Sequence, residues 1–263
     1  MYEKLICAPF NAVYFAVFAL FLALFLIGVF VLRKKPERTR AVVLSAAMLI
    51  TLVGFFVYKL FLSRDADFSR ITAEAGTGEF NWWGELPLQL CNINMILIPI
   101  AALSGKRILQ CFCFFMGPLG AGLALALPGI GFEHYSILLP RMIGYYGTHW
   151  MVVFGSLALG ALGLYKPKYK DYLLTLASAF GISFLIFLVN SLLRVTKLNL
   201  YANYFFTHEP EGNPILELFH SWLPFPFLCL IPCALILTPY VFLVVSIVRV
   251  ATRGAKEAEE KAD

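Results

Sequence analysis

The feature that most constrains this chain is a series of long apolar runs separated by short loops. A helix needs about 20 apolar residues to cross the hydrocarbon core of a bilayer, and runs of that length recur along the sequence. Of the 263 residues, 60% are hydrophobic and only 14% are charged, whereas a water-soluble domain has about 45–50% apolar and about 25% charged residues. The sequence therefore predicts an integral membrane protein, and its high aromatic content excludes disorder.

These runs predict an all-α fold, a polytopic membrane helix bundle with seven transmembrane helices in a single transmembrane domain over residues 1–263. The predicted spans cover residues 12–32, 41–62, 86–103, 108–127, 139–164, 172–193 and 222–248. A short charged tail follows at residues 249–263. The charged cluster follows the first span instead of preceding it, so we expect that span to remain as an anchor and not to be removed as a signal peptide.

The basic residues predict the orientation of the chain in its membrane. Clusters of them fall in residues 33–40, in Lys106 and Arg107, in residues 166–170 and in the tail, all on one side of the seven-span topology, while the longer segments on the opposite side hold fewer. By the positive-inside rule that side is cytoplasmic, which places the N-terminus outside and the C-terminus in the cytoplasm. The net charge of +5 thus reflects topology, and no nucleic-acid partner is expected.

Polar side chains inside the spans indicate where a site lies, because an ionisable or amide group is costly in hydrocarbon. The third span opens with Gln89, Cys91, Asn92 and Asn94, and the fifth carries Arg141, Tyr145 and His149 along one helix face. We expect both groups to meet in one buried cavity in the outer half of the membrane. The cytoplasmic halves hold few such groups, which favours an enzyme acting on lipids, since a transporter or channel needs polar lining on both sides.

Cys91 is the candidate nucleophile, because a thiol in apolar surroundings needs a nearby base or cation, which His149 and Arg141 would supply. Arg141 would also hold a lipid phosphate. The candidate donors to an oxyanion are the neighbouring amides Gln89, Asn92 and Asn94. Tyr145 lines the same face. In the outer loop, Asn203 and Tyr204 are expected to shape a lid. No metal or other cofactor is expected, because the sequence contains no HExxH or paired CxxC motif.

Several stretches, read in order, resemble the YwaF-type integral membrane proteins, a group related to eukaryotic membrane acyltransferases implicated in ether-phospholipid remodelling. They are residues 86–93, 117–120, 141–149 and 203–206, followed by Pro210, residues 213–214 and residues 221–227. The resemblance covers about residues 40–245 and implies a compact bundle of helices in a bacterial plasma membrane. It also implies that Cys91 and His149 are an acyl-transfer pair. Gln89 departs from the family, which more often has His there, so His149 is the sole candidate base.

The leading functional hypothesis is a phospholipid acyltransferase, transacylase or lipid hydrolase that works through a Cys91 thioester at the outer leaflet. Its partners would be phospholipids or lysophospholipids. One alternative is a transporter or lipid-binding membrane protein that uses the same polar pocket without covalent chemistry. A second is an assembly partner with no small-molecule site. The lipid class and the oligomeric state stay open at the level of sequence.

Overall fold

The computed structural model describes residues 5–74, 80–129 and 131–260, without the side chains of residues 72, 73 and 253–260. The first residues of the predicted outer N-terminus, part of the predicted outer loops and the end of the predicted tail lie outside the described residues. The predicted all-helical architecture is confirmed over the described part of the chain. A single two-stranded element joins Ile6–Cys7 (β1) to Tyr135–Ser136 (β2) in antiparallel fashion there.

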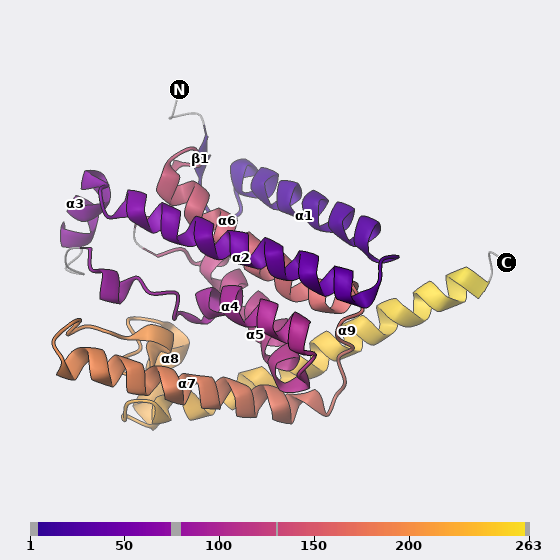
Figure 1. Cartoon of the computed structure of the whole chain (residues 1–263). Helices are drawn as coiled ribbons and strands as arrows, with labels where there is room; N and C mark the ends of the chain where they lie inside the picture. Colours follow the sequence, from indigo (N-terminus) through magenta and orange to yellow (C-terminus); the bar gives the residue numbers. More distant parts are fainter. Residues whose placement is uncertain (1–4, 75–79, 130, 261–263) are drawn as a thin grey trace.

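Nine α-helices and three short 3₁₀ helices make up the described chain (Figure 1). The α-helices are α1 (Ala12–Leu32), α2 (Glu37–Leu62), α3 (Ala66–Glu74), α4 (Leu90–Ser104), α5 (Arg107–Ala126), α6 (Pro140–Ala161), α7 (Asp171–Val195), α8 (Pro214–Trp222) and α9 (Ala234–Glu260). The 3₁₀ helices are η2 (Trp82–Gly84), η3 (Tyr204–Phe206) and η4 (Leu228–Cys233).

Five segments of the described chain are long and apolar enough to cross a membrane. They are α1, α2, α5, α7 and the segment Leu228–Thr252, which joins η4 to α9. The other two predicted spans correspond to α4 and α6. At 15 residues, α4 is about 22 Å long, which is less than the hydrocarbon core of about 30 Å. The count of seven thus depends on counting α4 and the polar, largely buried α6 as spans.

The predicted third span is wrong at its start, because residues 86–89 are not helical and α4 begins only at Leu90. Pro87 disfavours helical backbone at Leu86. The amide of Leu86 instead donates to Tyr204 Oη at 3.0 Å. Since α4 is short and ends at the same turn where α5 begins, its first residue lies inside the bundle instead of at a membrane surface (Figure 1).

The predicted seventh span is also wrong at its start. It was expected from residue 222, but α8 ends at Trp222 and the crossing segment begins at Leu228. Pro224 and Pro226 lie in between and cannot donate backbone hydrogen bonds to a helix. Phe227 has a left-handed backbone conformation, with φ of +63°, which separates the two helical segments.

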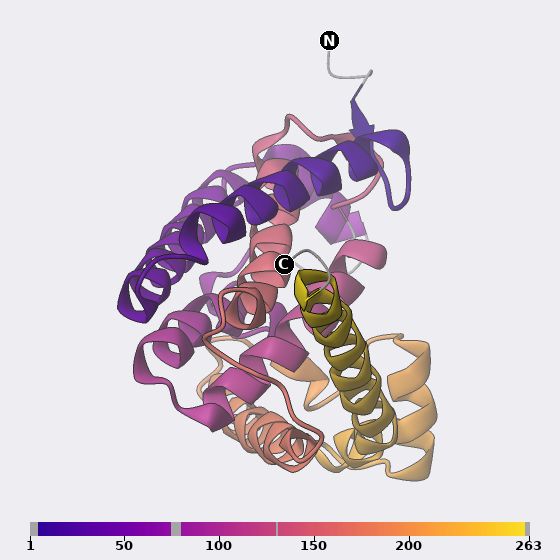
Figure 2. The ribbon, with the colours of Figure 1, turned by 90° about the vertical axis from the view of Figure 1, so that its right-hand side faces the viewer.

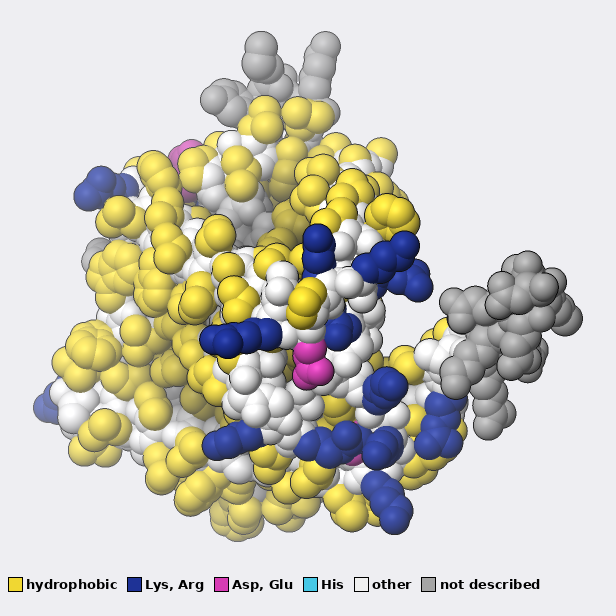
Figure 3. Space-filling view, turned by 45° about the vertical axis from the view of Figure 1, so that its right-hand side comes forward, with side chains coloured by type: hydrophobic (Ala, Val, Ile, Leu, Met, Phe, Trp, Pro, Cys, Tyr) yellow, Lys and Arg dark blue, Asp and Glu magenta, His cyan; other side chains and the backbone are white. Residues whose placement is uncertain are grey.

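Three turns gather at one end of the molecule, between α1 and α2, α4 and α5, and α6 and α7 (Figure 1). Lys and Arg side chains cluster on this face, whereas the flanks are mostly hydrophobic (Figure 3). We call it the basic end and the opposite one the far end. At the basic end, Arg40 of α2 donates a hydrogen bond to the carbonyl of Leu162, which follows α6.

The core forms where α2, α4, α5 and α6 pack on one another. Glycines allow the close approach, since a Cβ added to Gly144 of α6 would lie 2.1 Å from the Tyr58 ring, and small residues are typical of membrane-helix interfaces. In contrast, α1 lies on the outside, with α6 as its main helical partner (Figure 2). The helices α7 and α9 pack together below α5. The start of α4 is thus enclosed by α2, α5 and α6.

Candidate functional site

Cys91 is the second residue of α4, and its half-buried side chain is a free thiol. Its Sγ lies 3.6 Å from Oδ1 of Asn92. A Cβ added to Gly120 of α5 would lie 3.5 Å from the Cys91 amide nitrogen, so α5 packs closely on this turn. The thiol of Cys91 therefore lies at the N-terminal, positive end of the α4 helix dipole.

The amide groups at the start of α4 have no side-chain cap. Gln89 occupies the N-cap position but makes no cap hydrogen bond. Its Oε1 instead accepts from the amide of Phe205 at 3.1 Å. First-turn N–H groups of a helix lack intrahelical partners. An anion placed beside Cys91 would therefore meet backbone donors that no side-chain cap occupies.

A buried cation, Lys59 of α2, lies in the same region and was missed in the sequence analysis. Its side chain is 8% exposed, forms an ion pair with Glu85 and lies 4.9 Å from the centre of the Tyr58 ring. Because Glu85 lies in the segment that leads into α4, this ion pair joins α2 to the approach to that helix. A lysine inside the predicted span 41–62 was a visible signal by the same rule that selected the other site residues.

His149 of α6 is held in one orientation. Its Nδ1 lies 2.7 Å from the carbonyl oxygen of Tyr145 one turn earlier, so Nδ1 carries the proton and Nε2 is left as the acceptor. The Tyr145 ring lies 4.3 Å from the His149 ring, and Tyr145 Oη donates to the carbonyl of Ala124 at 2.6 Å. Among the described residues, no hydrogen bond joins Cys91 to Tyr145 or to His149.

Arg141, predicted to hold a lipid phosphate, is engaged elsewhere. It is 3% exposed, donates to Asp65 at 2.6 Å and stacks 4.4 Å from the centre of the Tyr135 ring. These contacts fasten the start of α6 to the turn that follows α2. The geometry favours a structural role for Arg141. Its partner Asp65 lies in the loop after the predicted span 41–62, where no local pattern indicated the pairing.

The amides near Cys91 differ in their surroundings. Asn94 is fully buried, and its Nδ2 donates to the carbonyl of Leu90 at 2.7 Å. Its Oδ1 has no partner among the residues that the structure describes. Asn92 is half-buried beside the thiol. Because Gln89 is bound to the outer loop, Asn92 is the amide side chain best placed to donate to a group bound at Cys91.

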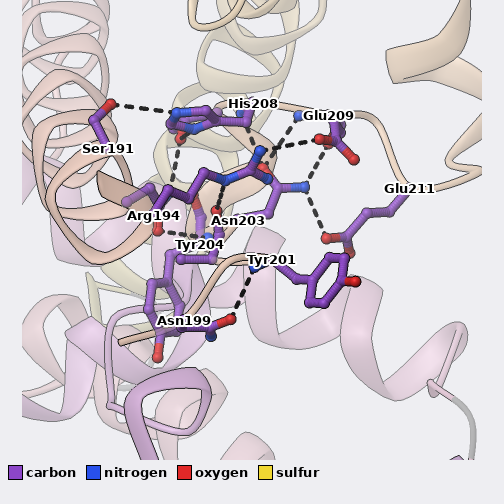
Figure 4. A network of polar contacts seen from close by, with 12 residues as sticks. Ser191, Arg194, Asn199, Tyr201, Asn203, Tyr204, His208, Glu209 and Glu211 are labelled. Carbon is purple, nitrogen blue, oxygen red and sulfur yellow. Dashed lines mark hydrogen bonds and ion pairs between the residues drawn. The ribbon is translucent and has the colours of Figure 1, made fainter. Parts of the chain in front are cut away.

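The loop predicted as a lid is fastened by several hydrogen bonds (Figure 4). Asn203 accepts from the amides of His208 and Glu209 and donates to the carbonyl of Glu209 and the carboxylate of Glu211. Tyr204 Oη donates to the carbonyl of Trp83 at 2.8 Å. The next residue, Phe205, has a φ of +60°, a strained conformation that surrounding contacts must maintain. These bonds hold the loop to itself and, through Trp83 and Gln89, to the segment that precedes α4.

A second buried polar network lies at the basic end, formed mainly by residues just beyond the ends of the predicted spans. Asp171, 2% exposed, accepts from Arg107 at 2.7 Å, from Tyr165 at 2.7 Å and from the amide of Lys168 at 2.7 Å. Gln110 donates to the carbonyl of Leu164. These groups bind one another and join α5, α7 and the connection before α7.

No three His, Cys, Asp or Glu side chains in the described residues form a group that could hold a metal ion. The half-buried thiol of Cys91, the buried imidazole of His149 and the buried ammonium of Lys59 lie on α4, α6 and α2, three helices that pack on one another. The all-helical fold and its long apolar helices define a multi-pass integral membrane protein.

The family model of the TMEM164 family matches residues 7–245, and the chain belongs to that family. The match runs from before α1 into the first half of α9 and includes every candidate site residue. No curated protein and no solved structure matches the chain.

Proposed function

We propose that this TMEM164-family chain is a phospholipid acyltransferase, transacylase or lipid hydrolase that forms a thioester on Cys91. The observation that carries the proposal is the position of the thiol, half-buried on the uncapped first turn of α4, which packs against the helices that carry Lys59, Tyr145 and His149. A pocket that only binds lipid has no need of a nucleophile. The resemblance to YwaF-type proteins supports the same pair, Cys91 and His149.

In the first half-reaction, Cys91 Sγ attacks the carbonyl carbon of a phospholipid ester while His149 Nε2 takes the thiol proton. The α4 amides and Asn92 hold the oxyanion, and Lys59 adds a positive charge nearby. The ester C–O bond then breaks, and His149 returns the proton to the departing lysophospholipid oxygen. The products are an acyl thioester on Cys91 and a lysophospholipid.

In the second half-reaction, a hydroxyl group attacks the thioester carbonyl while His149 takes the hydroxyl proton. The C–S bond breaks, and the proton passes to Cys91 Sγ, which regenerates the thiol. A lysophospholipid as acceptor gives acyl transfer, whereas water gives hydrolysis. The enzyme itself is unchanged in both cases.

The orientation in the membrane is part of the proposal. With α4 and α6 counted as spans, the basic end faces the cytoplasm by the positive-inside rule, and the N-terminus lies outside. The far end then faces the outer leaflet, from which the substrate would come. The resemblance to YwaF-type proteins favours a bacterial plasma membrane, with the chain as a single transmembrane domain.

A direct test is to look for the thioester. Purified protein is incubated with a phospholipid that carries a labelled acyl chain, and the label is released with neutral hydroxylamine, which cleaves thioesters. We expect label on the wild-type protein and on Cys111→Ala, but none on Cys91→Ala. A protein that turns lipid over without any Cys91 adduct would disprove the covalent mechanism.

A lipid transporter or lipid-binding protein remains the competing proposal, because the bundle also has an apolar groove between α1, α2 and α6 that a lipid could occupy. It predicts binding or movement of intact lipid with no released lysophospholipid. Mass spectrometry of the incubated lipids separates the two cases, since only the enzyme changes their acyl composition.

A further inference from the structure

An apolar groove lies between α1, α2 and α6. Its floor is formed by residues of α6 such as Gly147 and Met151, and its two walls by Phe21 of α1 and by α2 between Thr51 and Phe61. The cavity has a volume of about 390 Å³. A second compartment of about 200 Å³ continues it toward the basic end and shares Phe21 and Met151 with it.

The groove exists because α1 packs along α6 and not along α2. Rings of α1 contact rings of α6, with Phe18 lying 5.1 Å from Trp150 and Phe25 lying 5.2 Å from Phe154. On the opposite wall, α2 presents Gly54, where an added Cβ would meet nothing within 4 Å. The missing side chain on α2 and the aromatic contacts on α6 leave the space between the helices open.

The groove is lined almost entirely by apolar groups, with Thr51, Thr148 and Tyr58 as its polar side chains. Its two threonine hydroxyls are used within their own helices, since Thr51 Oγ1 donates to Ala47 at 2.9 Å and Thr148 Oγ1 to Gly144 at 2.6 Å. Ser/Thr bonding to the preceding turn is the usual way such residues are satisfied in apolar helices. The walls therefore suit a hydrocarbon chain far better than a polar ligand.

The size of the groove decides between a protein helix and a lipid chain. The α2 wall from Thr51 to Phe61 is about 15 Å long, or almost three helical turns. A helix about 10 Å wide fills about 400 Å³ in a single turn, so the cavity of about 390 Å³ would hold only one turn of it. A single extended hydrocarbon chain is much narrower and fits along the whole length.

We propose that this groove binds one acyl chain of a phospholipid from the leaflet at the far end. Its length of about 15 Å is half of a hydrocarbon core of about 30 Å, the depth that one leaflet occupies. Its mouth lies between Phe61 and Pro140, where α2 ends and α6 begins. Tyr58 lines the groove and its ring lies 4.9 Å from the ammonium of Lys59, so the bound lipid would lie beside that buried cation. The inference does not require the thioester chemistry.

Photo-crosslinking of the full-length protein in nanodiscs tests the groove. The probe is an ether-linked phosphatidylcholine with a diazirine in the middle of one chain, which no esterase can cleave. After irradiation, mapped crosslinks should concentrate in the peptides around Phe21, Gly54 and Met151. They should exceed several-fold those around Gly181, which lies on the exposed apolar surface of α7. Equal labelling of both surfaces would overturn the proposal, because it would mean that lipid merely solvates the groove.

A matched pair of substitutions sharpens the test. Gly54→Leu fills the groove, whereas Gly181→Leu places the same side chain where an added Cβ also meets nothing within 4 Å. We expect Gly54→Leu to lower crosslinking at Phe21 and Met151 several-fold and Gly181→Leu to leave it unchanged. If Gly54→Leu does not fold, Gly147→Leu fills the groove from α6, where the added Cβ would lie 3.9 Å from Phe21. Unchanged labelling in a folded groove-filling variant would contradict the proposal.

Cys91→Ala separates this inference from the proposed function. The variant should keep wild-type crosslinking in the groove even if all lipid turnover is lost. Groove labelling without any turnover in the wild-type protein would refute the enzyme and leave the groove in place. Turnover without preferential labelling of the groove would support the enzyme and refute lipid binding in the groove.

Discussion

Two buried polar networks, one at each end of the core, differ in how completely their groups are paired. At the basic end, both oxygens of Asp171 accept hydrogen bonds, from Arg107, Tyr165 and the Lys168 amide. Around Cys91, by contrast, Oδ1 of Asn94 has no partner among the described residues, and Gln89 does not cap α4. Buried polar groups are nearly always paired in native proteins. A saturated network is therefore a structural joint, whereas unused donors and acceptors indicate a place for a ligand.

The two networks also differ in what they join. The Asp171 network links α5, α7 and the connection between α6 and α7, and its bonds hold these elements at the basic end. The Cys91 network surrounds the start of a short helix, whose N-terminal amides have no neighbouring turn to bind. Each difference leads to a substitution that should affect one network and spare the other.

The largest expected effect is the loss of lipid turnover in Cys91→Ser. A serine hydroxyl is a much weaker nucleophile at neutral pH, so turnover should fall about 10³-fold or more while the fold is kept. Cys111 belongs to the paired network, with Tyr165 Oη 3.4 Å from its sulfur, and Cys111→Ser should keep its activity. Release of lysophospholipid measures both variants.

The same assay tests whether Cys91 and His149 act as one unit. If they do, His149→Ala should remove nearly as much turnover as Cys91→Ser, and the double variant should lose little more, because residues of one catalytic unit are strongly non-additive. If the fold-losses of turnover in the two single variants instead multiply in the double variant, His149 acts independently of the thiol.

The second effect is on stability. Removing one partner of a buried ion pair costs about 3–5 kcal/mol, and Asp171→Asn should lie near the lower limit because the Arg107 side chain is 38% exposed and can reach water. Thermal unfolding in detergent should therefore shift clearly downward, with normal turnover per folded molecule at low temperature. The control is Glu74→Gln, whose ion pair with Arg70 is on the surface and should contribute less than about 1 kcal/mol. Equal shifts in both variants would mean that the Asp171 network is not a structural joint.

A smaller effect is expected for Lys59, which pairs with Glu85 and also lies near Cys91. Lys59→Met leaves a carboxylate without its cation and should lower both stability and turnover. Adding Glu85→Gln removes the unpaired charge, so stability should recover. Turnover should stay about 10-fold to 100-fold low if the ammonium stabilises charge at the thiol and oxyanion. Full recovery of turnover in the double variant would make Lys59 a structural residue only.

Lys59 also shows which parts of the molecule the sequence could predict. Apolar runs predicted the helices α1, α2, α5, α6 and α7 to within a few residues, because length and hydropathy determine where a chain can be helical in a bilayer. The late starts of α4 and of the last crossing segment escaped prediction. They depend on Pro87, Pro224 and Pro226, and on a hydrogen bond between Leu86 and Tyr204 that joins residues far apart in sequence.

The sequence also could not predict which partner each buried polar side chain takes. The spacing of Arg141, Tyr145 and His149 indicated one buried face of α6, and the structure buries all three. Nothing local in the sequence showed that Asp65 would take up Arg141 or that the loop from Asn203 would be fastened to itself. Such partners are chosen by the tertiary fold, so residue type alone identifies the polar cluster but not the role of each member.

The smallest effect concerns the loop that closes over α4, whose stability should depend on pH. Burial, together with the nearby Arg194, lowers the pKa of His208. The unfolded loop thus binds a proton more readily than the folded loop, and stability is lost as pH falls below about 6.5. Burial raises the pKa of Glu211, which acts in the opposite sense in mildly acidic solution, so the net change should be small. The protection of residues 197–213 from hydrogen exchange, measured relative to the unfolded chain at the same pH, should fall slightly on acidification in the wild type. It should fall less in His208→Gln, which cannot take up the proton. An equal acid response in both proteins would assign the change to other groups than His208.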